Sequence, residues 1–194
     1  MLKEFTKFPS LENTYRQKEI DKIVMMEIKD KWVVTEKVHG ANFSFWVYKN
    51  VETKEIDIKC AKRSGWIEEG EKFFNYKSVL EKYRPMLEKL RGDVLDNFVI
   101  YGELFGGNIQ SGMCYSLEQD FVAFDMRWIN EDGSLGWALD KLTMLTLKDD
   151  YNLPVTPLIG VYDTFEEALA VEESFTSKLI RQDFDGKEEH KETE

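Results

Sequence analysis

Short segments rich in aromatic and β-branched residues recur along this sequence, and turn residues separate them. Residues 55–60 alternate polar and apolar side chains with period two, the pattern of a strand that is covered on one face. The composition of other segments also predicts strands, at residues 32–37, 42–48, 98–104, 121–129 and 155–162. This chain must therefore build a sheet that buries apolar side chains.

Segments with helical spacing separate these strands. Residues 18–28 and 76–90 each place their apolar side chains on one face, and Pro85 is a site where the second helix would kink or stop. We also expect a helix over residues 138–147, and another from a Thr164 cap to about residue 179. Antiparallel strands with interspersed helices and no internal repeat predict one α+β domain.

The distribution of charge bears on which partners the chain can have. The formal net charge is −11, which by itself argues against nucleic acid, because phosphate contacts normally come from a basic surface. Residues 163–194 hold 11 acidic and 4 basic residues, whereas residues 1–162 hold 26 and 22. The acidity is concentrated at the C-terminal end, where we expect residues 183–194 to form an acidic, polar and mobile tail.

Cysteine and histidine usage narrows the chemistry of a metal site. Cys60 and Cys114 lie far apart without a CxxC pairing, so we interpret both as reduced structural thiols. With only His39 and His190 and no Cys/His cluster, we expect a metal to be held by oxygen ligands and substrate phosphates. No window approaches the roughly 20 apolar residues of a membrane span. These features predict a soluble, intracellular, cytoplasmic protein without a membrane partner.

The most informative segment joins the first two predicted strands and reads EKVHGANFS over residues 36–44. It resembles motif I, KxHGxNF, of the RNA ligase 2 and RNA-editing ligase family. The related DNA ligases and capping enzymes generally have KxDGxR at this place, so His39 and Asn42 favour the RNA branch.

Further segments resemble the same family in the expected order. They are SLEN at residues 10–13, the arginine segment CAKRSG at 60–65, motif III as YGELFG at 101–106, and motif IIIa as FVAFD at 121–125. The resemblance runs to about residue 164. It implies a covalent nucleotidyltransferase fold, an ATP-grasp-like ligase adenylylation domain with mostly antiparallel sheets and flanking helices, spanning residues 1–182.

The resemblance implies an ATP-dependent RNA ligase in which Lys37 becomes covalently attached to AMP. A lysine amine attacks only when deprotonated, a state that cationic neighbours and partial burial favour, while Mg²⁺ neutralises the phosphates it approaches. Attack on the α-phosphorus of ATP gives lysyl-AMP and pyrophosphate. AMP then passes to an RNA 5′-phosphate, and a 3′-hydroxyl seals the strand. The pathway, whether repair, editing or defence, stays open, and the small single-domain format suits a phage or viral origin.

The matching positions imply a set of site residues. Arg63 is similar to the arginine that contacts the ribose, Glu103 to the motif III carboxylate that recognises ribose or helps to bind metal, and Phe124 to the aromatic that stacks on adenine. Gly40 would let the backbone approach a phosphate closely. The nucleotide would be bound by Glu36, Lys37, Val38, Asn42, Arg63, Glu103 and Phe124. Phosphates or an RNA end would be contacted by His39, Asn42, Lys62 and Arg63.

Several of these residues could instead have a purely structural role. Lys37 alone would be read as a solvated charge at the end of a strand, and His39 as a residue that caps or braces the loop. Arg63 alone would be read as one partner of a surface ion pair. An aromatic within an apolar strand is commonly part of the core, so Phe121 is the substitute for Phe124 if the register differs.

Two motifs of the family have no match in these residues. Motif IV is Glu-Gly before an apolar strand and lysine, and motif V is a Lys-x-Lys strand. Glu69-Gly70 comes too early, and residues 178–181 lie in a predicted helix. We therefore expect a domain that is truncated at its C-terminus, and three readings stay open. They are a ligase completed by a second polypeptide that carries motifs IV and V, a protein that binds ATP or RNA ends without ligation, and an inactive remnant.

Overall fold

The computed structural model describes residues 5–13, 15–26, 28, 30–111, 115–180 and 191–192. The chain divides into two compact units. The large unit contains Met1–Phe8, Val38–Thr156 and Ile180–Phe184, and the small unit contains Pro9–Lys37, Pro157–Leu179 and Asp185–Glu194. The chain crosses from the small unit to the large one between Lys37 and Val38, and crosses back between Thr156 and Pro157.

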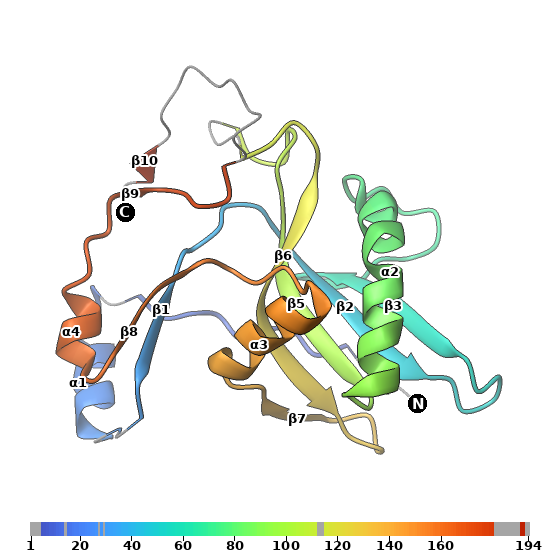
Figure 1. Cartoon of the computed structure of the whole chain (residues 1–194), viewed down its shortest axis with the longest axis horizontal. Helices are drawn as coiled ribbons and strands as arrows, with labels where there is room; N and C mark the ends of the chain where they lie inside the picture. The colour runs from blue at the N-terminus through green and yellow to red at the C-terminus, as the bar shows by residue number, and fades with distance from the viewer. Residues whose placement is uncertain are drawn as a thin grey trace. The chain divides into compact units, whose positions relative to one another are not determined.

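A six-stranded sheet forms the framework of the large unit (Figure 1). Its order is β4-β3-β2-β5-β6-β7, and every neighbouring pair is antiparallel. The strands are β2 (Ala41–Lys49), β3 (Ile56–Lys62), β4 (Gly65–Trp66), β5 (Phe98–Phe105), β6 (Asp120–Ile129) and β7 (Leu135–Ala138). The predicted α+β class with antiparallel sheets and flanking helices is confirmed.

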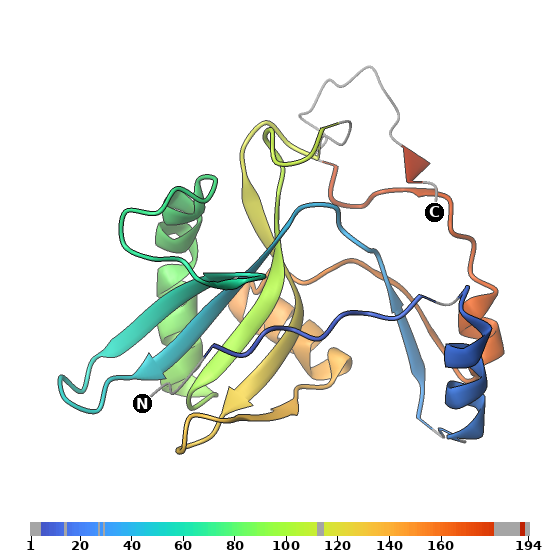
Figure 2. The same cartoon turned by 180° about the vertical axis from the view of Figure 1, so that it is seen from behind.

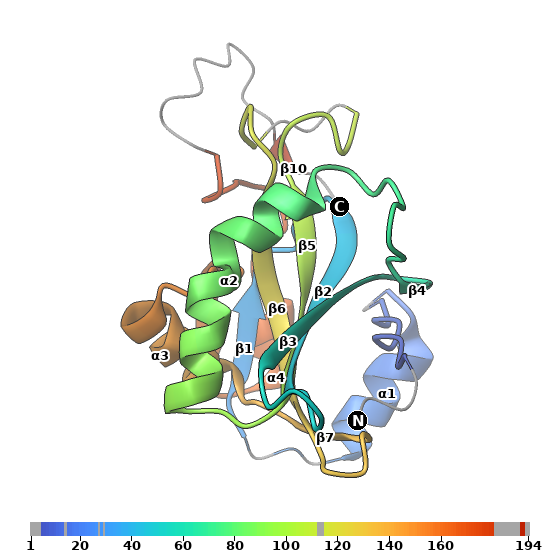
Figure 3. The same ribbon diagram turned by 90° about the vertical axis from the view of Figure 1, so that its right-hand side faces the viewer.

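One face of this sheet is closed by helices α2 (Tyr76–Asp93) and α3 (Lys141–Tyr151), as Figure 3 shows. Alternate residues of the strands point to this face, as the period of two requires. Buried side chains of α2 and α3 join those of the strands in one apolar cluster, which includes Phe43, Phe45, Leu87, Phe121 and Met144. This face holds most of the hydrophobic core.

The opposite face of the sheet has a smaller apolar cluster, made by Trp46, Ala61, Val99, Tyr101 and Ile129. The N-terminal segment crosses this face (Figure 2) and packs Phe5 and Phe8 against the cluster. The Tyr101 hydroxyl donates to the carbonyl of Thr6 at 2.9 Å. A single extended segment therefore covers this face, in place of a helical layer.

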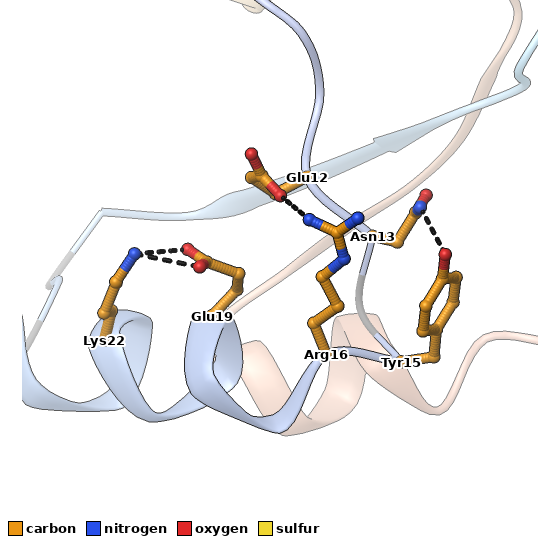
Figure 4. Close-up of polar contacts among 6 residues, drawn as sticks. All are labelled: Glu12, Asn13, Tyr15, Arg16, Glu19 and Lys22. Carbon is orange, nitrogen blue, oxygen red and sulfur yellow. Dashed lines mark hydrogen bonds and ion pairs between the residues drawn. The ribbon is translucent and has the colours of Figure 1, made fainter.

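The small unit is built on a two-stranded antiparallel ladder between β1 (Trp32–Thr35) and β8 (Leu158–Tyr162). Its other elements are α1 (Gln17–Met25), α4 (Phe165–Leu169), β9 (Phe175–Thr176) and β10 (Lys191–Glu192). The rings of Trp32 and Phe165 lie 4.9 Å apart and join β1 to α4. Figure 4 shows ion pairs on the exposed surface at α1, from Arg16 to Glu12 at 2.9 Å and from Lys22 to Glu19 at 2.8 Å.

Two predicted helices were wrong in their bounds. Residue 138 ends strand β7, and the helix expected at 138–147 begins at Lys141, because the Asp140 side chain caps it by accepting from the Thr143 N–H at 2.9 Å. The helix expected from Thr164 to about residue 179 stops at Leu169. Its predicted Thr164 cap is confirmed as a capping box, but the chain then extends into β9.

Smaller differences concern the other elements. Helix α2 continues through Pro85 without interruption, and strand β8 begins at Leu158 rather than at residue 155. Lys178 and Leu179 lie in a turn instead of a helix. Cys114, His190 and most of the predicted tail lie outside the described residues. Two residues of the tail are described, Lys191 and Glu192, and they pair with β9. Among the described residues, no helix has the length and apolar character to cross a membrane.

Candidate functional site

The segment of residues 36–40 is a loop between two strands, as predicted, but the two strands belong to different sheets. Strand β1 pairs with β8 in the small unit, and β2 lies inside the six-stranded sheet of the large unit. Lys37 is exposed at the end of the small unit, and Val38 is buried at the start of the large one. Lys37, the candidate nucleophile, is therefore the last residue of the small unit before the chain enters the large unit. The candidate residues that follow it in sequence all lie in the large unit.

Glu36 is buried, with 2% of its surface exposed, and its carboxylate is bound inside the small unit. It accepts hydrogen bonds from the Ser177 hydroxyl and, at 3.1 Å, from the backbone N–H of Lys178. Its own N–H donates to the carbonyl of Pro157 at 2.9 Å. Because a buried carboxylate is costly unless hydrogen bonded, these contacts fix the residue directly before Lys37.

The loop is also held on the side of the large unit. The His39 N–H donates to the Tyr115 hydroxyl at 3.1 Å, and the Gln110 side chain donates to the Gly40 carbonyl at 2.8 Å. A Cβ atom at position 40 would lie 2.1 Å from the Leu104 carbonyl oxygen, so only glycine fits there. These contacts brace the backbone of His39, whose side chain is half-buried.

Asn42 on β2 and Glu103 on β5 form a directly opposed cross-strand pair. Alternation along the strands puts both side chains on the same face as Trp46 and Tyr101, the face without helices. Both residues are half-buried, and opposed side chains on one face of an antiparallel pair are near enough to interact. The structure thus brings these two predicted residues together beside the smaller apolar cluster.

The register of β6 distinguishes Phe124 from Phe121. Gly102 lies opposite Ala123 and Tyr101 lies opposite Asp125, so Phe124 is the additional residue of a β-bulge. Its ring is half-buried and packs with the smaller cluster, on the face of Glu103. Phe121 is 1% exposed and belongs to the main core on the other face. Of these two phenylalanines, Phe124 is therefore the one on the face without helices, which we call the candidate face.

The two basic candidates at the end of β3 lie in different surroundings. Lys62 is half-buried and forms an ion pair with Glu71, a partner that no sequence pattern predicted. Arg63 is exposed in the turn between β3 and β4. A phosphate contact by Lys62 would have to compete with the Glu71 carboxylate.

Three residues near the bulge were missed by sequence reasoning. The Lys141 amine donates to the Phe124 carbonyl at 3.2 Å and to the Thr156 hydroxyl at 2.9 Å. Burial lowers the pKa of Lys141 to about 8, and the negative charge of Asp125 opposes that shift. Burial raises the pKa of the Asp125 carboxyl. Asp125 stood within the motif IIIa match, whereas no local pattern indicated Lys141 or Thr156.

The carboxylates of the described residues form no preassembled metal site. No group of three or more His, Cys, Asp or Glu side chains is placed to hold a metal ion in the described part of the chain. Glu103 is the carboxylate on the candidate face next to Asn42. This arrangement fits Mg²⁺, which commonly binds through one or two carboxylates, waters and substrate phosphates.

Known proteins resemble this chain in sequence and in fold. The family model for RNA ligase matches residues 30–192. Mitochondrial RNA-editing ligase 2 of Trypanosoma brucei brucei is 41% identical over 86 residues, which cover 41% of this chain and 20% of that protein. Mitochondrial RNA-editing ligase 1 is 33% identical over 85 residues, covering 39% and 18%. The chain thus matches about a fifth of the length of these curated relatives.

Solved structures of a Naegleria gruberi RNA ligase share the fold. A mutant with ATP and Mn has a TM-score of 0.66 at 20% identity and covers 90% of this chain and 50% of its own. A second mutant, with AMP and Mn, has a TM-score of 0.63 at 21% identity and covers 91% and 51%. The family match extends over most of the chain, and the segments that resemble motifs III and IIIa lie on β5 and β6, as predicted. This chain belongs to the RNA ligase family.

Proposed function

We propose that this chain is the adenylylating part of an ATP-dependent RNA ligase, with Lys37 as the nucleophile. The observation that carries the proposal is the loop of residues 36–40 in a member of the RNA ligase family. Lys37 is exposed where the chain passes from the small unit to the large one, with Glu36 hydrogen bonded within the small unit and Gly40 within the large one. An exposed amine is accessible to a nucleotide, and a near-attack position favours the reaction.

The first chemical step forms one bond and breaks one. The neutral amine of Lys37 attacks the α-phosphorus of ATP, the new bond is N–P, and the bond from the α-phosphorus to the β-phosphate oxygen breaks. Pyrophosphate leaves, and the amine loses a proton to solvent. The product is lysyl-AMP. In this scheme Asn42, His39 and Arg63 donate hydrogen bonds to phosphate oxygens or to the ribose.

The nucleotide is recognised by the face of the large sheet that has no helices. Phe124 stacks on the adenine, Glu103 binds a ribose hydroxyl or the metal, and Val38 and Glu36 contribute backbone contacts. Lys62 contacts a phosphate only when its ion pair with Glu71 breaks. When bound, Mg²⁺ would reside on Glu103 and the phosphates and would neutralise phosphate charge. The supporting observation is that Asn42, Glu103 and Phe124 share one face.

The second and third steps concern RNA. AMP passes from Lys37 to an RNA 5′-phosphate, and attack by a 3′-hydroxyl joins the ends and releases AMP. Both trypanosome relatives carry the name RNA-editing ligase. If residues 1–194 form lysyl-AMP but do not join RNA ends, joining would require a partner, a second polypeptide that carries motifs IV and V.

The test is covalent labelling of the folded chain. Purified protein is incubated with ATP radiolabelled at the α-phosphate and with Mg²⁺, and is then separated by denaturing electrophoresis. We expect a labelled band, and we expect Lys37→Met to abolish it.

Lys31→Met is the matched control, because Lys31 is also an exposed lysine of the small unit, next to the other end of β1. It should label like the wild type. A folded wild-type protein without label, or equal labelling of the Lys37→Met variant, would sink the proposal.

A further inference from the structure

We propose that Lys141 is a positioning residue that clamps the bulged backbone at Phe124 to Thr156 and thereby sets the orientation of the Phe124 ring toward the adenine base. This inference rests on the proposed function, because that function gives Phe124 its ligand. It assigns a role to a half-buried lysine that lies in none of the family motifs above.

The backbone at the bulge needs partners from outside the β5–β6 ladder. Phe124 has no counterpart on β5, and the residue added at a bulge is left out of the regular pairing. Its carbonyl accepts from the Lys141 amine at 3.2 Å. The preceding residue, Ala123, is held by the segment that follows α3, since its N–H donates to Pro154 at 2.7 Å and its carbonyl accepts from the Thr156 N–H at 2.9 Å.

Lys141 itself is anchored at both ends. It is the first residue of α3, whose N-terminus is capped by Asp140 and whose Met144 and Leu147 are buried in the main core. At the other end its amine also donates to the hydroxyl of Thr156, at 2.9 Å, and Thr156 is 3% exposed. The clamp therefore connects the bulge to a buried hydroxyl and to a helix that the core holds in place.

The charges around the clamp explain why a lysine is tolerated in this half-buried position. A buried ammonium group is costly unless it is paired and hydrogen bonded, and the carboxylate of Asp125 lowers that cost. Asp125 also accepts from the Arg127 guanidinium at 3.2 Å. Arg127 lies over the ring of Phe8, and the Phe8 ring contacts the Phe124 ring at 4.9 Å. Polar groups thus hold the backbone of the bulge, and an aromatic ring contacts Phe124 on the candidate face.

The clamp should affect recognition of the base and leave recognition of the phosphates unchanged. Lys141→Met removes the amine and keeps an unbranched apolar side chain. Loss of part of a base–aromatic stack predicts about tenfold weaker binding. The triphosphate contacts proposed for His39, Asn42 and Arg63 do not involve Lys141.

The experiment measures two affinities by calorimetry on the full chain. One probe is an ATP analogue with a methylene group between the α- and β-phosphorus atoms, which cannot release pyrophosphate. The other probe is inorganic tripolyphosphate, which has no base. The matched control is Lys148→Met, which removes an exposed lysine from the same helix. Thr156→Val serves as a second variant that removes the hydroxyl partner with little change in volume.

We expect about tenfold weaker binding of the analogue to Lys141→Met and a smaller loss in Thr156→Val. Tripolyphosphate affinity should stay at the wild-type value in both variants, and Lys148→Met should bind both probes normally. Unchanged analogue affinity in Lys141→Met would overturn the positioning role, and so would an equal loss for both probes. A wild-type chain that binds neither probe would instead reject the proposed function. If Lys141→Met does not fold, Thr156→Val decides by the same criterion.

Discussion

The two faces of the six-stranded sheet are built from the same strands but have different coverings. The face under α2 and α3 holds the main apolar cluster, including Phe121 at 1% exposure. The other face has a smaller cluster, an extended N-terminal segment, and the half-buried candidates Asn42, Glu103 and Phe124. Helices close the first face, whereas the second face keeps half-buried polar and aromatic side chains, on which the proposed nucleotide site depends. Alternation along the same strands thus separates the residues of the main core from the residues proposed for recognition.

The largest expected effect is on the closed face. Phe121→Ala removes a ring that contacts Phe43, Phe45 and Tyr83, and truncation of such a core aromatic costs about 3–5 kcal/mol. We expect a loss of this size in urea unfolding. Phe124→Ala should cost clearly less, because its ring is half-buried. Equal losses in the two variants would break the distinction between the faces.

The next effect is on recognition. Phe124→Leu keeps an apolar side chain of similar size but removes the aromatic stack, which is worth about 1–3 kcal/mol per base in related contexts. We expect about five- to 150-fold weaker binding of the methylene ATP analogue by calorimetry, since 1.4 kcal/mol corresponds to a factor of ten. Lys148→Met again provides a neutral comparison. Wild-type affinity in Phe124→Leu would remove the adenine contact from this face.

The smallest effect is a pH dependence of stability. The pKa of Lys141 is about 8 in the folded chain, against 10.5 for an unperturbed lysine. Between these values the unfolded chain holds a proton that the folded chain has released, so stability rises with pH. From pH 7 to pH 9 the wild type should gain about 1.4 kcal/mol relative to Lys141→Met.

This prediction is read from urea unfolding of both proteins at several pH values. The difference between them isolates Lys141, because burial also raises the pKa of the Cys60 thiol, to about 12, in the same folded structure. Ionisation of Cys60 in the unfolded chain affects both proteins equally. A difference that stays constant from pH 7 to pH 9 would show that the amine does not titrate as its burial requires.

Local patterns in the sequence predicted much of the fold and the place of the candidate loop. Period-two alternation located β3, and aromatic and β-branched composition located β2, β5 and β6. The strand–loop–strand context of Lys37 was also predicted. These strands and this loop could be predicted because the pattern of polar and apolar residues in a strand depends only on residues close together in sequence.

Features that depend on distant residues were not predicted. The burial of Glu36 depends on Ser177 and Lys178, which are more than 140 positions away. The bulge at Phe124 depends on its register with β5, and its clamp depends on Lys141 and Thr156. The helix end at Leu169 was missed, because the strand that follows it, β9, pairs with Lys191 and Glu192, which lie further along the chain.

Peptide mapping can test whether Lys37 carries AMP. The folded chain is incubated with ATP and Mg²⁺, digested, and searched by mass spectrometry for a peptide that bears AMP. We expect AMP on the Lys37 side chain and on no other lysine. AMP on a different residue, or a folded chain that binds ATP and yields no modified peptide, would contradict it.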